Sequence, residues 1–130
     1  MKSKPSDIKQ RILVVDDDHQ IGELLYEFLD SKGFDVLYAD NGTQGVDLLK
    51  RARPHIVLLD VKMKDVNGLE VLRRMVEIDP KVVVIMITAL HENEVGRQAL
   101  ELGAVDFITK PIDLGYLAVS IEAKLADLFS

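Results

Sequence analysis

Five side chains in this sequence could together bind a metal ion and handle a phosphoryl group. Asp16 and Asp17 directly follow the apolar run RILVV, and Asp60 ends the apolar run HIVLLD. Thr88 ends the run KVVVIMIT, and Lys110 follows VDFIT. If these runs are parallel strands of one sheet, their carboxyl ends meet at the same edge. We therefore expect three carboxylates, one hydroxyl and one ammonium group to converge on one crevice.

The three carboxylates predict a site for a hard cation. Two carboxylates about 4 Å apart repel each other by roughly 4 kcal/mol at an effective dielectric constant near 20, so a cluster of them takes up protons or binds a cation. The sequence has no cysteine and no histidine pair near these positions, which leaves oxygen atoms as ligands. Oxygen ligands with room for water and phosphate favour Mg²⁺ over Zn²⁺.

The same side chains could support phosphoryl transfer. A carboxylate beside Mg²⁺ can attack phosphorus in line and form an aspartyl phosphate, while a lysine and a threonine bind the equatorial oxygens. Asp60 is the best candidate for the nucleophile because it stands alone at its strand end. Asp16 and Asp17 would then hold the metal, whereas Asp18 is better explained as the N-cap of the helix that follows.

The pattern of apolar residues predicts the elements that would position these side chains. Five short runs rich in Val, Ile and Leu alternate with segments of helical spacing, and the first, third and fourth runs are almost continuously apolar, as in strands buried on both faces. The predicted strands are residues 11–16, 35–40, 55–60, 81–88 and 105–109. The helical stripes include Ile21, Leu24, Leu25, Phe28 and Leu29; Leu69, Leu72, Met75 and Val76; and Leu114, Leu117, Ile121, Leu125 and Leu128.

Capping residues agree with this alternation. Asn41 and Asp113 precede helical segments as N-caps, and Gly33 and Gly103 follow helical segments where a left-handed residue is favoured. Five successive strand and helix units in a chain of this length predict an α/β fold with a doubly wound parallel sheet.

Composition limits the domain organisation and the partners. A chain of 130 residues with 48% hydrophobic content suits one domain, preceded by a polar extension over residues 1–10. The absence of cysteine fits a reducing, cytoplasmic location. The longest apolar run is too short to cross a bilayer, which takes about 20 residues, and the formal charge of −6 opposes a nucleic acid surface. We expect no membrane contact and no direct nucleic acid binding by this chain.

Four motifs resemble the receiver domain of bacterial two-component response regulators, of the chemotaxis-regulator and phosphorelay type. They are ILVVDDD, IVLLDVKMKDVNGLEVL, VIMITAL and GAVDFITKPID, in the order and spacing of that family. The resemblance runs from Arg11 to Phe129 and implies a receiver domain over residues 11–129. It also implies a flavodoxin-like (βα)5 sandwich with a five-stranded parallel sheet of order 2-1-3-4-5. Two positions depart from the family pattern, since Lys64 replaces a common proline and Asn67 a common aspartate.

The resemblance assigns roles around the acceptor. It implies that Asp60 accepts the phosphoryl group, that Asp16 and Asp17 bind Mg²⁺ directly or through water, and that the Lys62 backbone carbonyl completes the protein's metal ligands. The donor would be a phosphohistidine on a sensor histidine kinase or a histidine phosphotransfer domain. The chain would catalyse its own phosphorylation and lose the group slowly by hydrolysis, acting as a signalling switch more than as an enzyme.

The resemblance also assigns the switch. It implies that Thr88 is the switch hydroxyl, that Phe107 is an aromatic rotamer switch and that Lys110 pairs with the phosphoryl group, with Pro111 in the cis form. Phe107 also has a simpler interpretation as core packing. The face made by the fourth helix, fifth strand and fifth helix would serve a partner or a homodimer. Because the sequence ends soon after the last predicted helix, we expect no output domain within this chain.

Two other classes of protein remain open at this point. A phosphohydrolase of the haloacid-dehalogenase type would use Asp16-x-Asp18, then Thr88 and Lys110, but it would leave Asp60 without a role. A receiver-like module that binds a partner without phosphorylation would need none of the acidic set. Stable phosphorylation in the presence of Mg²⁺ separates these hypotheses.

Overall fold

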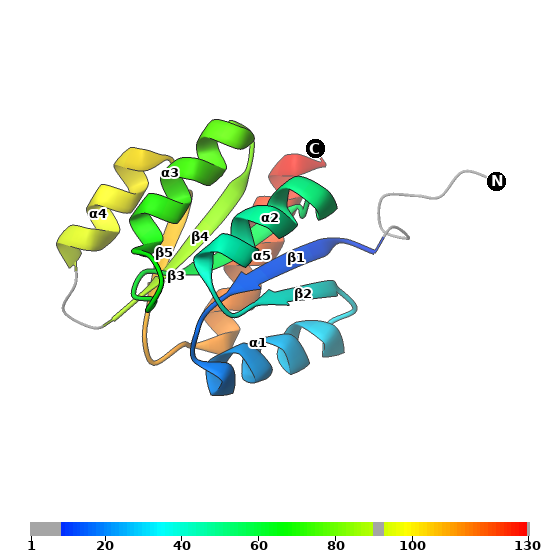
Figure 1. Ribbon diagram of the computed structural model, residues 1–130. Coiled ribbons are helices and arrows are strands. Elements are labelled where there is room, and N and C mark those ends of the chain that lie inside the picture. The colour runs from blue at the N-terminus through cyan, green and yellow to red at the C-terminus, as the bar shows by residue number, and fades with distance from the viewer. Residues whose placement is uncertain (1–8, 90–92, 130) are drawn as a thin grey trace.

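A five-stranded parallel sheet between two layers of helices forms the body of the protein (Figure 1). The structure is a computed structural model, and it describes residues 9–89 and 93–129. The strand order is β2-β1-β3-β4-β5, which confirms the predicted flavodoxin-like topology. The elements in chain order are β1 (Arg11–Val15), α1 (His19–Ser31), β2 (Asp35–Ala39), α2 (Gly42–Ala52), β3 (Ile56–Asp60), α3 (Gly68–Ile78), β4 (Val83–Thr88), α4 (Asn93–Leu102), β5 (Asp106–Thr109) and α5 (Leu114–Leu128).

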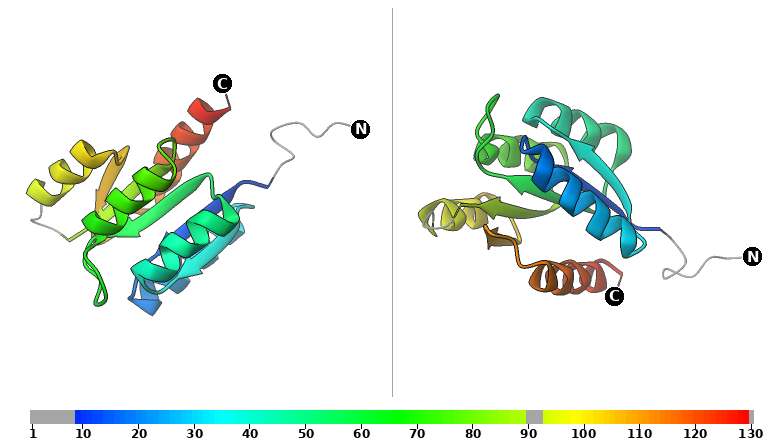
Figure 2. Two further views of the ribbon diagram at one scale, coloured as in Figure 1. Left: turned by 45° about the horizontal axis from the view of Figure 1, so that its top comes forward. Right: turned by 90° about the horizontal axis from the view of Figure 1, so that it is seen from below.

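The helices divide between the two faces of the sheet (Figure 2). One face packs on α1 and α5 through buried side chains that include Leu25, Leu29, Leu117 and Ile121. The other face packs on α2, α3 and α4 through buried side chains that include Leu49, Leu72, Met75 and Ala99. Both faces of the central strands are thus covered, and for this reason the strands are apolar along their whole length.

Local hydrogen bonds determine where β4 begins. β4 begins at Val83, two residues later than the sequence predicted, because Asp79 holds the preceding residues in a turn. Its carbonyl accepts from the Val82 amide at 3.0 Å, and its carboxylate accepts from the Lys81 amide at 3.1 Å. Of the predicted N-terminal extension 1–10, only Lys9 and Gln10 lie among the described residues.

The predicted caps are confirmed. Asp18, Asn41 and Asp113 have extended backbones, and their side chains accept hydrogen bonds from amides in the first turns of α1, α2 and α5. Gly33 and Gly103 have φ of 91° and 116°, the left-handed region that glycine adopts without strain.

Candidate functional site

The carboxyl ends of the strands bring the predicted residues to one edge of the sheet. Asp16 directly follows β1, Asp60 ends β3 and Thr88 ends β4. In the register of β3 and β4, Asp60 pairs with Ile87, the residue before Thr88. Asp60 and Thr88 therefore lie on neighbouring strands. Lys110 follows β5, and its amide donates to the Thr88 carbonyl at 2.8 Å.

Three carboxylates form a cluster at this edge. Asp16, Asp17 and Asp60 each offer one oxygen, and these oxygens all lie within 4.8 Å of one another. Asp16 and Asp60 are buried, with 1% and 4% of their surface exposed, whereas Asp17 is half-buried. One Asp16 oxygen accepts from the Asp18 amide at 2.9 Å, and its other oxygen, Oδ2, is buried without a hydrogen bond from any residue that the structure describes. Hard oxygen donors and an unsatisfied buried oxygen fit Mg²⁺.

Lys110 supplies the positive charge of the cluster. Its Nζ lies 3.2 Å from Asp60 Oδ1 and 3.7 Å from Asp16 Oδ2. Although burial opposes the charged form, the two carboxylates raise the pKa of Lys110 above its ordinary value. The lysine therefore stays protonated, and it offsets only part of the negative charge of the three carboxylates.

The pKa values of Asp60 and Asp16 show how burial and the remaining repulsion act on the carboxylates. Burial, followed by the charge of Asp16, raises the pKa of Asp60 to about 6, although Lys110 acts in the opposite direction. Burial also raises the pKa of Asp16 above its ordinary value. Both shifts mean that the charged carboxylates are under-stabilised, so a divalent cation among them would be bound favourably.

Thr88 and Phe107 lie on the same face of the sheet, under α4. Thr88 is fully buried, and its hydroxyl oxygen has no hydrogen-bond partner among residues 9–89 and 93–129. Phe107 pairs in register with Met86, two residues before Thr88, and its half-buried ring packs against the core. The ring also fills the space beside Gly96, where an added β-carbon would lie 2.7 Å from Phe107 Cδ2. The packing interpretation of Phe107 thus has direct contacts, while its switch role stays a prediction.

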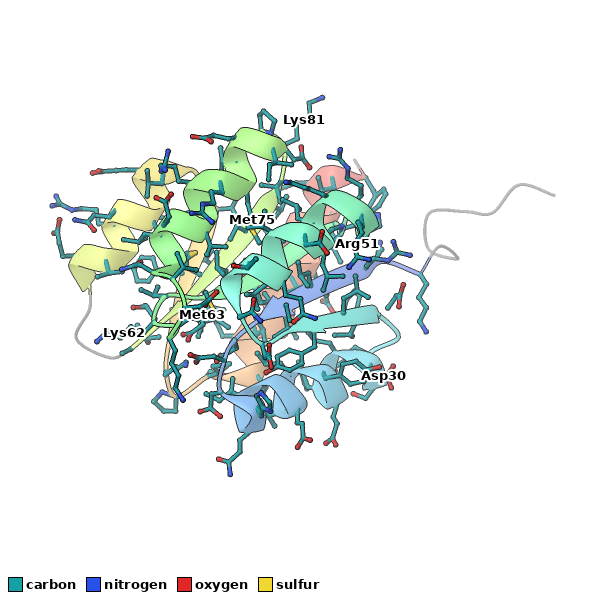
Figure 3. The ribbon with its side chains drawn as sticks, viewed as in Figure 1. Asp30, Arg51, Lys62, Met63, Met75 and Lys81 are labelled. Carbon is teal, nitrogen blue, oxygen red and sulfur yellow. The ribbon has the colours of Figure 1, made fainter. Side chains whose placement is uncertain are left out.

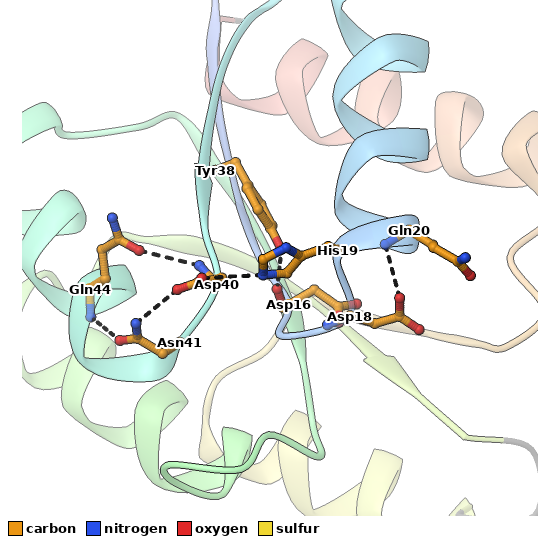
Figure 4. Close-up of polar contacts among 8 residues, drawn as sticks. All are labelled: Asp16, Asp18, His19, Gln20, Tyr38, Asp40, Asn41 and Gln44. Carbon is orange, nitrogen blue, oxygen red and sulfur yellow. Dashed lines mark hydrogen bonds and ion pairs between the residues drawn. The ribbon is translucent and has the colours of Figure 1, made fainter.

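Tyr38 is a neighbour of the site that the sequence did not predict (Figure 4). Its hydroxyl donates to the Asp16 backbone carbonyl at 2.7 Å. The ring lies across α1 where Gly22 leaves room for it, and it meets the edge of the His19 ring at 6.1 Å between centroids. His19 Nε2 in turn lies 3.3 Å from Asp40 Oδ2. A tyrosine on an alternating strand gives no sequence signal for such a contact.

The loop between β3 and α3 is a second neighbour that the sequence did not predict in detail. Lys62 and Met63 lie in this loop (Figure 3), and the next amide, that of Lys64, donates to Asp17 Oδ2 at 2.8 Å. This contact requires a backbone N–H at position 64. The presence of Lys64 in place of the family's common proline was therefore a sequence feature that could have indicated this hydrogen bond. At a different place in the site, directly after β5, the peptide bond between Lys110 and Pro111 is cis.

Asp18 stands apart from the cluster. Its carboxylate accepts from the amides of Gln20 and Ile21, at 3.0 and 3.4 Å, as the N-cap of α1. This placement disfavours the pair Asp16 and Asp18 that the phosphohydrolase alternative requires, because Asp16 shares the cluster with Asp17 and Asp60.

Comparison with known proteins identifies the family. Residues 12–122 match the family described as response regulator receiver domain. The chain belongs to this family. It is a receiver domain of the kind that works in two-component systems, as the resemblance implied.

Receiver domains of two kinds of protein are similar to this one. It is 36% identical over 118 residues to sporulation initiation phosphotransferase F of Bacillus subtilis, spanning 95% of that protein. It is 37% identical over 118 residues to the DNA-binding response regulator MtrA of Mycobacterium tuberculosis, but it spans only 51% of that protein. The receiver domain thus covers nearly all of one relative and about half the length of the other.

Solved structures agree with the fold. The CheY-like response regulator receiver domain protein from Methanospirillum hungatei has 31% sequence identity and a TM-score of 0.85, over 92% of this receiver domain and 96% of that chain. The response regulator receiver domain protein from Clostridium thermocellum has 27% identity and a TM-score of 0.87, over 91% and 95% of the two chains. Within residues 9–89 and 93–129, no helix has the length and hydrophobicity to span a membrane.

Proposed function

We propose that this receiver domain is a phospho-accepting switch in which Asp60 receives a phosphoryl group from a phosphohistidine. The observation that carries the proposal is the position of Asp60. Its carboxylate is buried at the end of β3, 3.2 Å from a lysine and within a cluster of two further carboxylates. The donor would be a sensor histidine kinase or a histidine phosphotransfer domain.

Mg²⁺ is the cofactor that the site fits best. Asp16, Asp17 and Asp60 would hold it through side-chain oxygens, and Lys62 would do so through its backbone carbonyl. When bound, the ion lowers the repulsion between the acceptor and the incoming phosphoryl oxygens. Asp16 Oδ2 accepts no hydrogen bond within the described residues, and burial raises the pKa of Asp60. Both observations support this assignment, because a cation would stabilise these buried carboxylates.

The chain's own residues would carry the transfer. An Asp60 carboxylate oxygen attacks phosphorus as the bond between phosphorus and the imidazole nitrogen breaks, and the bonding electron pair leaves with the imidazole. Lys110 would move from pairing with the carboxylate to pairing with a phosphoryl oxygen. The Thr88 hydroxyl, which has no hydrogen-bond partner in the described part of the unphosphorylated chain, would donate to another phosphoryl oxygen. Slow hydrolysis of the aspartyl phosphate would reset the switch.

The face of α4, β5 and α5 is the proposed output surface. Exposed hydrophobic residues occur along these elements and just before β5: Leu100, Leu102, Val105, Tyr116 and Val119. A groove next to them is lined by Phe107, Ile108, Thr109, Pro111, Asp113 and Tyr116. A partner or a second copy of the chain would cover this face. The receiver boundaries of 11–129, the absence of direct nucleic acid contact and a cytoplasmic location remain predictions.

Intact mass spectrometry tests the function. The protein is incubated with a small phosphodonor such as phosphoramidate, with Mg²⁺ or with EDTA. We expect one phosphoryl group per chain with Mg²⁺, almost none with EDTA, and none on the Asp60→Asn variant. Failure of the parent to gain the group would favour the receiver-like module that works without phosphorylation. Full labelling of Asp60→Asn would move the nucleophile to another residue.

A further inference from the structure

The first turn of α2 receives a carboxylate from a distant loop. The amides of Gly42, Thr43 and Gln44 precede the first helical hydrogen bond, which Gly45 donates to the Asn41 carbonyl. Asn41 caps only one of these three free amides, that of Gln44, at 2.8 Å. The amides of Gly42 and Thr43 instead donate to the Asp65 carboxylate, at 3.1 and 3.3 Å.

These contacts hold the charge of Asp65 in place. Although its slight burial acts in the opposite direction, hydrogen bonds from the amides of Gly42 and Thr43 hold the pKa of Asp65 below its ordinary value. The amino end of α2 also carries the positive end of the helix dipole, which favours a carboxylate there. The Thr43 hydroxyl adds a contact of 3.5 Å to the same oxygen.

Asp65 lies in the loop that reaches the metal ligands. The preceding amide, that of Lys64, donates to Asp17 Oδ2, and the loop also carries the Lys62 carbonyl. On the other side of Asp65, the Val66 side chain fills the space beside Gly42 and leaves no room for a β-carbon there. The loop is thus attached to α2 by a charged hydrogen-bond pair and by packing.

We infer that Asp65 is a positioning residue for the metal site. By anchoring the loop on the first turn of α2, it fixes the Lys64 amide, and the hydrogen bond from this amide to Oδ2 holds the Asp17 carboxylate beside Asp16 and Asp60. Hydrogen-bonded partners of metal ligands commonly contribute about 10- to 100-fold to metal affinity, and Asp65 acts one contact further away. The inference rests on the proposed Mg²⁺ site, and it adds that Mg²⁺ binding is felt at the start of α2.

A Mg²⁺ titration of the ¹⁵N-labelled full chain tests this role without any measurement of phosphorylation. In the parent, we expect the amide signals of Gly42 and Thr43 to shift with the same binding curve as that of Asp17. Asp65→Ala should raise the Mg²⁺ dissociation constant about 3- to 10-fold, less than loss of a direct partner of a ligand. It should also remove most of the Mg²⁺-dependent shift at Gly42 and Thr43.

Two further variants separate positioning from charge and from folding. Asp65→Asn keeps one acceptor oxygen and should restore part of the affinity and part of the α2 response. Asp47→Ala removes the same charge from the exposed side of α2, where Asp47 pairs with Arg51, and should leave both readouts unchanged. If Asp65→Ala unfolds, Asp65→Asn carries the test alone, with a dissociation constant at least about twice that of the parent.

The outcomes distinguish this inference from the function on which it rests. Parent-like Mg²⁺ affinity in both folded Asp65 variants would overturn the positioning role and leave the metal site intact. Equal weakening by Asp47→Ala would show that net charge alone is responsible, and would also overturn it. Absence of Mg²⁺ binding to the parent would overturn the metal site itself and the inference with it.

Discussion

Asp60, the proposed acceptor, has a pKa that makes the stability of the fold depend on pH. Its folded-state pKa is about 6, against an ordinary value of 3.8, so the folded chain keeps this proton to a higher pH than the unfolded chain does. Metal-free stability should therefore fall as the pH rises from about 4 to about 6, by up to about 3 kcal/mol for this group alone. Above that range the charged carboxylate remains a constant penalty.

The variant Asp60→Asn should lack this contribution to the pH dependence of stability. Without a proton to lose at position 60, the free energy of unfolding in EDTA should change between pH 4 and pH 7 by about 1–3 kcal/mol less than in the parent. Urea denaturation followed by circular dichroism, at several pH values, gives the comparison. A pH profile identical to that of the parent would mean that Asp60 has an ordinary pKa in the folded chain.

Thr88 is a second residue of the site whose surroundings lower the stability of the fold. A hydroxyl that is buried without a partner costs about 1–3 kcal/mol, and Thr88 is fully buried, with an oxygen that no described residue hydrogen-bonds. Thr88→Val keeps the shape and should raise the free energy of unfolding by about 1 kcal/mol in the metal-free protein. Thr109→Val, on the neighbouring strand where the side chain is only half-buried, serves as the control and should change stability less. A loss of stability in Thr88→Val would imply a hydrogen bond to this hydroxyl.

Residue types and their positions in the sequence were enough to predict part of the site. Asp16, Asp60, Thr88 and Lys110 could be placed together because each ends a recognisable apolar run, and parallel strands align such ends. Asp65 could not be placed, because its contacts with α2 depend on the path of a seven-residue loop, residues 61–67, and not on any repeat. Tyr38 was hidden for the opposite reason, since a half-buried strand residue has an ordinary packing explanation.

The elements themselves were largely encoded in local sequence. Continuous apolar runs gave the strands that both helix layers cover, and capping residues such as Asn41 and Asp113 marked the helix starts. The end of α2 was not predicted, because Arg53 there adopts a left-handed conformation, with φ of 47°, that favours glycine. Pro54 follows Arg53 and disfavours the right-handed helical conformation there, so it indicates a helix end, but it does not indicate the left-handed conformation of Arg53.

At the interface of α4 and β5, Gly96 makes room for the Phe107 ring. Alanine is favoured over glycine in a helix by about 1 kcal/mol, yet a β-carbon at position 96 would lie 2.7 Å from Phe107 Cδ2. We expect Gly96→Ala to destabilise the protein by about 1 kcal/mol in spite of its higher helix propensity, and to move the ring toward solvent. Gly115→Ala is the matched control, because its β-carbon would meet only the Asp113 carboxylate, at 3.3 Å.

Chemical denaturation and NOE contacts of the Phe107 ring measure the two effects. The ring of the parent should show contacts to the α4 backbone near Gly96, and these should weaken in Gly96→Ala and persist in Gly115→Ala. If Gly96→Ala is more stable than the parent with unchanged ring contacts, then α4 and β5 are loosely packed, and Phe107 is a poor candidate for a switch.

At the scale of the whole molecule, the site and the proposed output face share one layer. Thr88 ends β4 and Phe107 pairs with the same strand, while α4 packs over both strands. A phosphoryl group on Asp60 would add about two negative charges and three strong acceptors. These would draw the Thr88 hydroxyl toward them and change the space available to the Phe107 ring, so the conformation of α4 and β5 would respond.

Amide spectra of the Mg²⁺-saturated protein, before and after addition of a phosphoryl mimic such as beryllofluoride, test this coupling. Measured from the Mg²⁺-loaded state, the shifts should be larger at Thr88 and across residues 93–102 and 105–110 than in α2. Thr88→Val should still bind the mimic but show a smaller response across α4 and β5, because it has no hydroxyl to move. The shift of population need not be complete, since moving an equilibrium from 1:99 to 99:1 takes about 5.5 kcal/mol of differential stabilisation. A full-sized response of α4 and β5 in Thr88→Val would mean that the Thr88 hydroxyl does not couple the site to these elements.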